Sequence, residues 1–494
     1  MAVAEVVVTV VLLHVQEFAQ DVQRLVMLPT VIILAIIHVI RHVEALAIEH
    51  APEAVIPAAD NVISISISLK ILIKIFRLIE KNVGIKECRN NMRPKSQLIY
   101  EPSGQWEQGG AKNITFIVTK DCQLACKYCY LVGKNEKERM TFEVAKKAID
   151  YILSHEQDFP ESSVIWDFIG GEPFLEIDLI DRICDYILTE TYKLNHHWFG
   201  KFRYSFSTNG INYDSEKVQA FIQKYRDYLS IGITIDGTKA KHDLNRIWKG
   251  DGPEKGSYED VVKNIPLWLS QFNRGATKVT ISSADIPYVC ESVLHLFDLG
   301  IHEVNINVVF EDVWKEGDDI LFEEQLMKLA DEIIDNDLYR DNTCSFFKEG
   351  IGVPLDPVHE NNNWCGAGRM LSIDAAGNFY PCTRFAAYSL RDKKPIIIGN
   401  VYDGIDYNKL RPFLTLDRLT QSPRECIECE VANGCSWCQG ENYDAAETPT
   451  IYQRSVAICK MHKARVRANN YYWNKLFSKL KTQLSDSDAV NSHS

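Results

Sequence analysis

Ten of the 14 cysteines in this 494-residue chain fall into two clusters whose spacing could build metal centres. The first cluster is Cys122, Cys126 and Cys129, three thiols within eight residues. Soft thiolates suit zinc or iron–sulfur clusters. Zinc usually takes a fourth Cys or His, and none follows closely. Three thiolates on a four-iron cube would leave one iron without a protein ligand, and that iron could chelate a substrate.

The second cluster contains seven cysteines spread over the last third of the chain. They are Cys365, Cys382, Cys426, Cys429, Cys435, Cys438 and Cys459. Taken alone, these seven thiols would equally suit two zinc-ribbon-like sites. Of the remaining cysteines, Cys184 and Cys290 lie in amphipathic stretches and are predicted to be buried packing residues.

The spacing Cys-x3-Cys-x2-Cys, with Tyr128 before the last cysteine, resembles the radical S-adenosylmethionine superfamily. The resemblance implies that the open iron binds the amino and carboxylate groups of S-adenosylmethionine. One electron from the cluster would then break the sulfur–C5′ bond. The resulting 5′-deoxyadenosyl radical would abstract a hydrogen atom from the substrate.

Further residues fit the cosubstrate contacts of that family. Gly170-Gly171-Glu172-Pro173 stands one β/α unit after the cysteine loop, at the position of the family's GGEP motif. Glycines allow close backbone approach, and a carboxylate pairs with an ammonium group. The resemblance implies that the cosubstrate is bound by these residues and by Tyr128, Ser207, Asn209 and Asp236.

The second cysteine set resembles the auxiliary-cluster extension called SPASM. By resemblance, one [4Fe–4S] cluster would be held by Cys426, Cys429, Cys435 and Cys459. A second would be held by Cys365, Cys382 and Cys438, with Cys344 as a candidate fourth ligand. The chain has two residues between Cys435 and Cys438, where the family pattern has three, and this departure weakens the ligand assignment.

Alternating strand-like and helix-like segments must position these motifs. Six apolar runs are typical of strands, at 113–120, 164–171, 203–210, 229–237, 278–283 and 303–311. Amphipathic stretches such as 142–155 separate them. Six β-then-α units are too few for a closed eight-fold barrel. We therefore predict an α/β fold, a partial (β/α)6 TIM-type barrel followed by a small cysteine-rich iron–sulfur domain. The chemistry should lie at the carboxyl ends of the strands.

Composition divides the chain into four segments. Residues 1–91 have no Trp or Tyr, and their first glycine is Gly84. They are either a small helical or partner-binding domain or not part of the natural protein, translation then starting at Met92. The barrel is predicted over 92–340. The auxiliary-cluster domain is predicted over 341–484, with a last helix at 462–484 and a frayed tail at 485–494.

Charge and patterning exclude several classes of function. The net charge of −13 argues against a nucleic-acid partner. The longest uncharged apolar stretch, between Arg24 and Arg41, is too short and too polar for a confident membrane span. The first residues lack the basic region of a signal peptide, so a cytoplasmic location with reduced thiols is expected.

The resemblance narrows the reaction to peptide modification. Enzymes with SPASM extensions mostly modify peptides, and sulfatase maturases generally place an Asp base directly after the cysteine matching Cys382. This chain has Thr383 there, and residues 364–385 look more like maturases that form thioether links in cysteine-rich ribosomal peptides. Sulfatase-maturase-like chemistry, carbon–carbon crosslinking and a non-catalytic peptide-binding scaffold remain alternatives.

The thioether interpretation implies two partners, a precursor peptide and an electron donor such as flavodoxin or ferredoxin. No general base can be assigned from the sequence. His196, His197 and His242 show no metal-site pattern and are expected to be surface or loop residues.

Overall fold

The computed structural model describes residues 110–491, with gaps at 133, 135, 251–252, 273–274 and 356–364. The N-terminal segment 1–91 and the start at Met92 therefore lie outside the described residues. All elements named below belong to one compact unit, residues 98–494.

Six parallel strands lie in two sheets, each strand within a few residues of the place that the sequence predicts. They are β1 (Ala111–Thr119), β2 (Ser163–Gly170), β3 (Phe202–Thr208), β4 (Leu229–Ile233), β5 (Ala276–Ile281) and β6 (Glu303–Val308). β1 to β4 pair in sequence order, and β5 pairs with β6. Between β4 and β5 the ladder is interrupted, and the Thr277 hydroxyl donates to the carbonyl of Ile233 at 2.8 Å instead.

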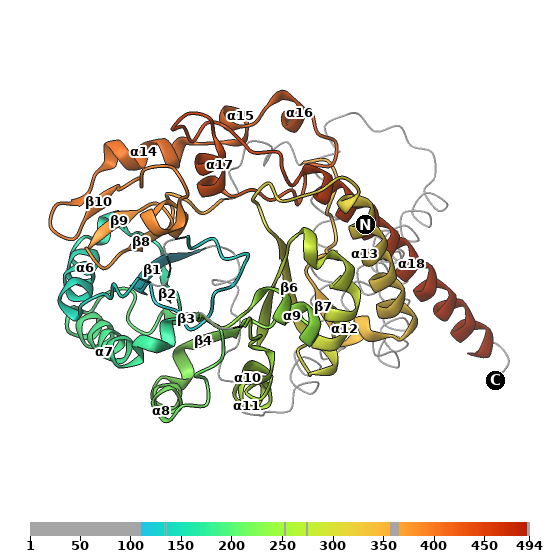
Figure 1. Ribbon diagram of the computed structural model, residues 1–494, viewed down its shortest axis with the longest axis horizontal. Helices are drawn as coiled ribbons and strands as arrows, with labels where there is room; N and C mark the ends of the chain where they lie inside the picture. The colour runs from blue at the N-terminus through green and yellow to red at the C-terminus, as the bar shows by residue number, and fades with distance from the viewer. Residues whose placement is uncertain are drawn as a thin grey trace, which may run out of the picture. The chain divides into compact units, whose positions relative to one another are not determined.

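Helices between these strands cover the outer face of the sheet (Figure 1). They are α6 (Phe142–Ser154), α7 (Ile177–Lys193), α8 (Glu216–Lys224), α9 (Lys239–Asn245), α10 (Tyr258–Val262), α11 (Ile265–Gln271) and α12 (Val289–Asp298), and α13 (Asp318–Asp335) follows β6. The prediction of an open, partial barrel is confirmed. Cys184 and Cys290 are buried in α7 and α12, as predicted.

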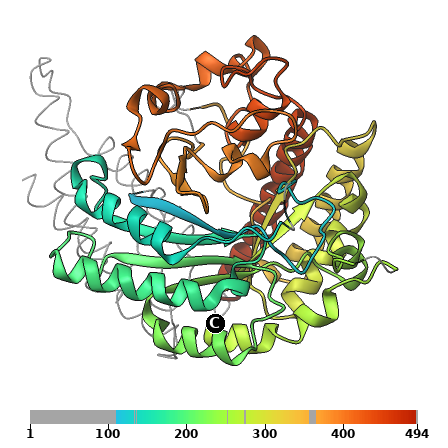
Figure 2. The ribbon, with the colours of Figure 1, turned by 60° about the vertical axis from the view of Figure 1, so that its left-hand side comes forward.

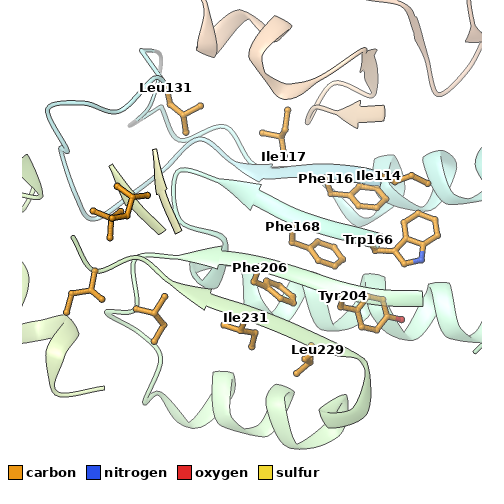
Figure 3. Packing of buried hydrophobic residues seen from close by; sticks show 14 of the residues in the cluster. Ile114, Phe116, Ile117, Leu131, Trp166, Phe168, Tyr204, Phe206, Leu229 and Ile231 are labelled. Atoms are coloured by element: carbon orange, nitrogen blue, oxygen red, sulfur yellow. The ribbon is translucent and has the colours of Figure 1, made fainter. Parts of the chain in front are cut away.

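Aromatic side chains fix the register of the first three strands. Phe116, Phe168 and Phe206 are register partners, and their rings stack at centroid distances of 5.7 and 5.3 Å. Phe206 also meets Phe221 of α8, with centroids 5.6 Å apart. Figure 3 shows this row crossing the sheet. Each such side chain contributes about 1.5–3 kcal/mol on burial, so a slip of one residue would expose the whole row.

The opposite face of the same strands is polar. Thr115, Asp167 and Ser205 share one register across β1, β2 and β3. Burial raises the pKa of Asp167 from 3.8 to about 6, and hydrogen bonds from Ser205 and Thr115 and the charge of Lys278 offset this only in part. The interior of the barrel therefore holds a carboxyl group that is costly to ionise.

We expect Asp167→Asn to stabilise the protein increasingly as the pH rises through the window between 3.8 and 6. A raised carboxyl pKa means that the folded state binds more protons in this window, so stability falls as the pH rises. The penalty is complete above pH 6 and amounts to at most about 3 kcal/mol. Thermal unfolding at about pH 4.5 and about pH 8 measures it. Asp298→Asn, at the exposed end of α12, is the control. An equal gain at both pH values for Asp167→Asn would contradict the assignment.

The cysteine-rich region continues the barrel sheet. β8 (Leu371–Ile373) pairs parallel with β1, and β9 (Asn378–Tyr380), β10 (Gly399–Asn400) and β11 (Gly404–Ile405) follow antiparallel. Figure 2 shows this region (orange) beyond β1, at the opposite end of the sheet from β4. Four short helices complete it: α14 (Tyr407–Thr415), α15 (Arg418–Gln421), α16 (Arg424–Ile427) and α17 (Gln439–Ala445).

The last helix, α18, runs from Cys459 to Asn491 and is longer than the predicted 462–484. It packs on α13, where Lys475 Nζ lies 2.7 Å from Asp331 and 2.9 Å from Asp335. β7 (Thr343–Cys344) adds a short strand beside β6. Within the described residues, no helix is both long and apolar enough to cross a membrane.

Candidate active site at the carboxyl ends of the strands

The loop that follows β1 brings Cys122, Cys126 and Cys129 together as free thiols. A second backbone segment holds this loop in place. The amide of Ala125 donates to the carbonyl of Ile247 at 2.8 Å, and the amide of Lys127 donates to Asn245 at 3.0 Å. The three thiols are therefore positioned by contacts that do not depend on a bound metal.

Burial and the neighbouring cations act in opposite directions on the thiols of the loop. Burial raises the pKa of Cys122 to about 12, and the nearby carboxylate of Glu172 adds to this. Burial also raises the pKa of Cys126, against the positive charges of Arg246 and Lys134. Thiols must lose their protons to bind a metal. The two cations beside the loop offset the negative charge that three thiolates and a cluster would bring.

The two glycines before Glu172 are required by close backbone contact with this loop. A Cβ on Gly170 would lie 2.1 Å from the carbonyl oxygen of Thr119, and one on Gly171 would lie 2.1 Å from that of Asp121. The amides of Gly171 and Glu172 donate to the same two carbonyls at 2.9 Å. The end of β2 is thus joined directly to the cysteine loop.

Glu172 is buried, and its carboxylate faces the end of β3. It accepts hydrogen bonds from the amide of Phe174 (3.0 Å), the hydroxyl of Thr208 (2.7 Å) and the amide of Asn209 (2.7 Å). Pro173 follows, buried at the start of a short 3-10 turn. A carboxylate has about four lone-pair sites, so one stays available for an ammonium group. The residues present therefore fit the cosubstrate contact that the resemblance implies.

We expect Gly171→Ala to weaken binding of S-adenosylmethionine by at least about tenfold. The added methyl group meets backbone rather than a flexible side chain, so the cysteine loop and Glu172 must move apart. Calorimetry with the iron-loaded protein measures the affinity. Gly250→Ala is the matched control, because nothing lies within 4 Å of a Cβ there. Wild-type affinity in Gly171→Ala would show that this contact does not position Glu172.

The remaining residues predicted to bind the cosubstrate differ in whether their side chains already have hydrogen-bond partners within the protein. Ser207 is exposed on β3. The side-chain amide of Asn209 donates to Gln123 at 3.0 Å and lies 3.9 Å from the Cys122 sulfur. The Tyr128 hydroxyl donates to Asp236 in a short hydrogen bond. Tyr128 and Asp236 therefore bind each other and tie the cysteine loop to the end of β4.

A cluster of buried charged groups behind this pair has no signal in the sequence. Arg246 donates to the Tyr128 hydroxyl at 3.0 Å. Burial would raise the pKa of Asp236, but the charges of Lys241 and Arg246 hold it below its usual value. Lys241 is fully buried and pairs with Asp285 at 3.5 Å. These residues lie at irregular positions in 236–285, and only folding brings them together.

The expectation that His242 is a surface or loop residue is wrong, because it lies in α9. His196 and His197 lie in the loop after α7, as expected. His242 is fully buried and its Nε2 lies 3.0 Å from the Ser257 hydroxyl. Burial lowers the pKa of His242 to about 3, so it is neutral.

His196 is also buried, and His197 is partly exposed. Their ring nitrogens and the carboxylate of Glu156 lie within 4.8 Å of one another. The amide of Trp198 donates to Nδ1 of His196 at 3.2 Å. Neutral His196 therefore carries its proton on Nε2, which faces Glu156 at 3.8 Å and offers no lone pair to a metal.

The seven later cysteines fall into the two groups that the resemblance implies. Four line one cavity of about 70 Å³, namely Cys426, Cys429, Cys435 and Cys459. The other three lie close enough to affect one another's ionisation, namely Cys365, Cys382 and Cys438. Cys344 lies instead on β7, beside Arg465 and Tyr472 of α18. Its position gives no support to a role as fourth ligand.

A cavity of about 400 Å³ opens beside the three-cysteine loop. Its lining comes from the loop, from the ends of β5 and β6 and from the cysteine-rich region, and includes Tyr130, Val132, Ser283, Glu311, Arg384 and Glu441. The barrel and the cysteine-rich region thus enclose one site.

Arg384 connects the two walls of this cavity. Its Nη2 lies 2.9 Å from Glu311, after β6, and 2.9 Å from Glu441 of α17. Its guanidinium also stands 4.7 Å from the ring centroid of Tyr130. Arg391 completes the network by pairing with Glu441 at 2.6 Å. Sequence reasoning missed this network, because its members are 57 and 73 residues apart.

Comparison with known sequences identifies the barrel. Residues 116–282 match the family model described as Radical SAM superfamily. An uncharacterised protein of Methanocaldococcus jannaschii is 31% identical over 205 residues, which cover 40% of this chain and 63% of that protein. The cysteine-type anaerobic sulfatase-maturating enzyme of Clostridium novyi is 30% identical over 152 residues, which cover 30% of this chain and 38% of that enzyme.

Matches that cover more of the chain have a lower sequence identity. The antilisterial bacteriocin subtilosin biosynthesis protein AlbA of Bacillus subtilis is 23% identical over 334 residues, 66% of each chain. The chain thus spans less than two thirds of the length of these relatives. Among solved structures, native anSMEcpe with bound AdoMet aligns with a TM-score of 0.56 at 18% identity. The alignment covers 75% of this chain and 99% of that one, a likeness of fold.

Proposed function

This chain carries a radical S-adenosylmethionine domain at residues 116–282, and from that premise we propose that it is a peptide maturase. It would cleave S-adenosylmethionine reductively and modify a ribosomally made peptide by forming thioether links. One observation carries the proposal. The three-cysteine loop and the cysteine-rich region line the same 400 Å³ cavity, with Cys129 on one wall and Arg384, close to Cys438, on the other.

The residues present fit three iron–sulfur clusters. Cys122, Cys126 and Cys129 would hold the cluster that meets S-adenosylmethionine. The two later groups of thiols would hold the auxiliary clusters. When bound, the first cluster supplies the electron that splits S-adenosylmethionine into methionine and a 5′-deoxyadenosyl radical.

The protein's own groups bind and orient the reactants. Glu172 offers its free lone pair to the cosubstrate ammonium group. The cavity would hold a radical between Tyr130 on one side and the ion pair of Arg384 with Glu441 on the other. Walls on these two sides would reduce the access of water to the radical, and with it the side reactions of a reactive intermediate.

The thioether reaction balances without a further oxidant. One electron is taken up when S-adenosylmethionine is cleaved. The deoxyadenosyl radical then removes a hydrogen atom from the acceptor carbon of the peptide. A cysteine thiolate bonds to that carbon, its proton having gone to solvent, and the one electron released replaces the electron taken up in the cleavage. Each link therefore consumes one S-adenosylmethionine and one thiol.

Two observations favour thioether formation over sulfatase-type oxidation. Thr383 follows Cys382, so the carboxylate base typical of sulfatase maturases is absent at that position. The group of Cys365, Cys382 and Cys438 has three thiols rather than four, which leaves room for a substrate thiolate. A sulfatase-maturase-like or carbon–carbon crosslinking reaction is the alternative, and mass spectrometry of the product separates them by mass change and fragment linkage.

The proposal implies a cytoplasmic enzyme with two partners, a precursor peptide and a flavodoxin or ferredoxin as electron donor. A non-catalytic peptide-binding scaffold is the alternative of another class. Anaerobically reconstituted protein is incubated with dithionite and S-adenosylmethionine, and 5′-deoxyadenosine is measured. Formation of 5′-deoxyadenosine supports the enzyme. Its absence at full iron content would favour the scaffold.

A further inference from the structure

Arg454 is a buried cation beside the four-cysteine cavity, and the mechanism proposed above does not use it. Only 9% of the residue is exposed. Its Nη2 lies 3.1 Å from the sulfur of Cys435, and both residues line the cavity of Cys426, Cys429, Cys435 and Cys459. The guanidinium therefore points at the place where these thiols converge.

The neighbours of Arg454 orient it without neutralising it. Its guanidinium stacks over the ring of Trp437, 4.2 Å from the centroid. Its Nη1 lies 3.4 Å from the hydroxyl of Ser422. Both partners are uncharged, and among the residues that the structure describes no carboxylate forms an ion pair with Arg454. A buried charge without a counter-ion is costly, and the sulfur of Cys435, in contact with the guanidinium, is a group that can supply a negative charge.

The other charged side chains at this cavity are less closely directed at the sulfurs. Lys463 and Glu425 also line it and carry opposite charges. His462 is buried, with Nε2 2.7 Å from the carbonyl oxygen of Val431, and burial lowers its pKa. Among the described residues that line this cavity, Arg454 is thus the cation that contacts a sulfur.

Such a contact has a defined effect on an iron–sulfur cluster. A hydrogen bond to a ligand sulfur and a nearby positive charge both stabilise the reduced form, which carries one more negative charge. The effect is large where the site is buried, because the charge is poorly screened there.

We propose that Arg454 sets the reduction potential of the cluster held by Cys426, Cys429, Cys435 and Cys459, making that cluster easier to reduce. The inference rests on the proposed function only in that these four cysteines hold a cluster. Arg454 acts through the Cys435 sulfur and is a positioning residue, not a catalytic one.

The test is a redox titration of the iron-loaded, full-length protein followed by electron paramagnetic resonance. The signal of this cluster is the one that persists in Cys126→Ala and Cys438→Ala backgrounds and does not respond to S-adenosylmethionine. Arg454→Gln removes the charge. We expect its reduced-to-oxidised ratio at a fixed potential to fall about tenfold, a shift of about 59 mV to more negative values for a one-electron couple.

Arg424→Gln is the matched control, because it makes the same change in the helix that carries Cys426. The Arg424 side chain is 87% exposed and pairs with Glu428. Its titration should match the wild type. If Arg454→Gln loses iron, Arg454→Lys takes its place, with a smaller shift in the same direction. An unchanged potential in the variant that retains its iron overturns the inference. Failure of the wild-type four-cysteine group to bind iron would instead refute the cluster assignment itself.

Discussion

Cys126→Ala is expected to abolish the formation of 5′-deoxyadenosine, by at least about a hundredfold. Cys126 is one of only three thiols on the loop after β1, and the structure places Arg246 and Lys134 rather than a fourth cysteine among the groups around it. A cube that loses one of three protein ligands is poorly held, so cosubstrate cleavage should fail with it. Anaerobic reconstitution, reduction with dithionite and chromatography of the nucleosides measure the effect.

The matched control for this experiment is Cys184→Ala. Cys184 is also buried, but it lies in α7 among apolar side chains and belongs to neither cysteine cluster. This variant should lose some stability through the small cavity it creates, and should keep its cleavage activity. Retained cleavage in Cys126→Ala, at normal yield of folded protein, would refute the assignment of the first loop.

Cys438→Ala is expected to keep the cleavage of S-adenosylmethionine but to lose the modification of the peptide. Cleavage of S-adenosylmethionine should stay within about twofold of the wild type, because the first loop is held by 245–247 and by Glu172 and receives nothing from Cys438. Modified peptide should fall by at least about a hundredfold. Cys438 immediately precedes α17, which carries Glu441 and with it the far wall of the cavity.

The assay for Cys438→Ala needs a cysteine-rich precursor peptide, which reading frames beside this gene would identify. Mass spectrometry of the peptide and chromatography of 5′-deoxyadenosine are run on the same reaction. Cys344→Ala is the control, since Cys344 is a buried cysteine of the same part of the chain but lies beside Arg465. Full product from Cys438→Ala would mean that the cysteine-rich region is not needed for the chemistry.

The two variants also test two separate parts of the proposed function. Cys126→Ala tests whether the barrel performs radical chemistry. Cys438→Ala tests whether the second group of cysteines takes part in modifying the peptide. If Cys126→Ala loses cleavage but Cys438→Ala still makes the full amount of product, the protein is a radical enzyme of another kind. Its cysteine-rich region would then serve only as a wall of the cavity.

Local patterns in the sequence predicted most of the fold and the cysteines proposed as metal ligands. Apolar runs of strand length located all six barrel strands, because strands covered on both faces need continuous burial. The three thiols of the first loop followed from spacing, since thiols three or four positions apart on a loop can reach one metal centre without help from distant parts of the chain. The division of the seven later cysteines followed from the resemblance to the SPASM extension, because Cys435 and Cys438 are three positions apart but fall in different groups. The GGEP stretch was recognisable from its resemblance to the family motif, and its glycines are required by the close contact with the carbonyls of Thr119 and Asp121.

Contacts between distant segments could not be read in this way. Lys241 and His242 lie within the short helix α9 and Arg246 directly follows it, with no periodicity to mark them. Their roles appear only when 236–246 folds against the cysteine loop. The location of His242 was predicted wrongly because a single histidine in a sequence carries no signal that distinguishes a surface position from a buried one.

By itself the sequence determined the six-strand barrel and the three thiols after its first strand, and the family resemblance implied the grouping of the later cysteines. The tertiary structure alone decided that β8 extends the barrel sheet beside β1, that Arg384 joins Glu311 to Glu441 across the cavity, and that Arg454 points at Cys435. The physical reason is how far apart along the chain the interacting residues lie. Secondary structure and ligand spacing depend on neighbours along the chain, whereas buried charges find their partners only after residues tens to hundreds of positions apart have packed together.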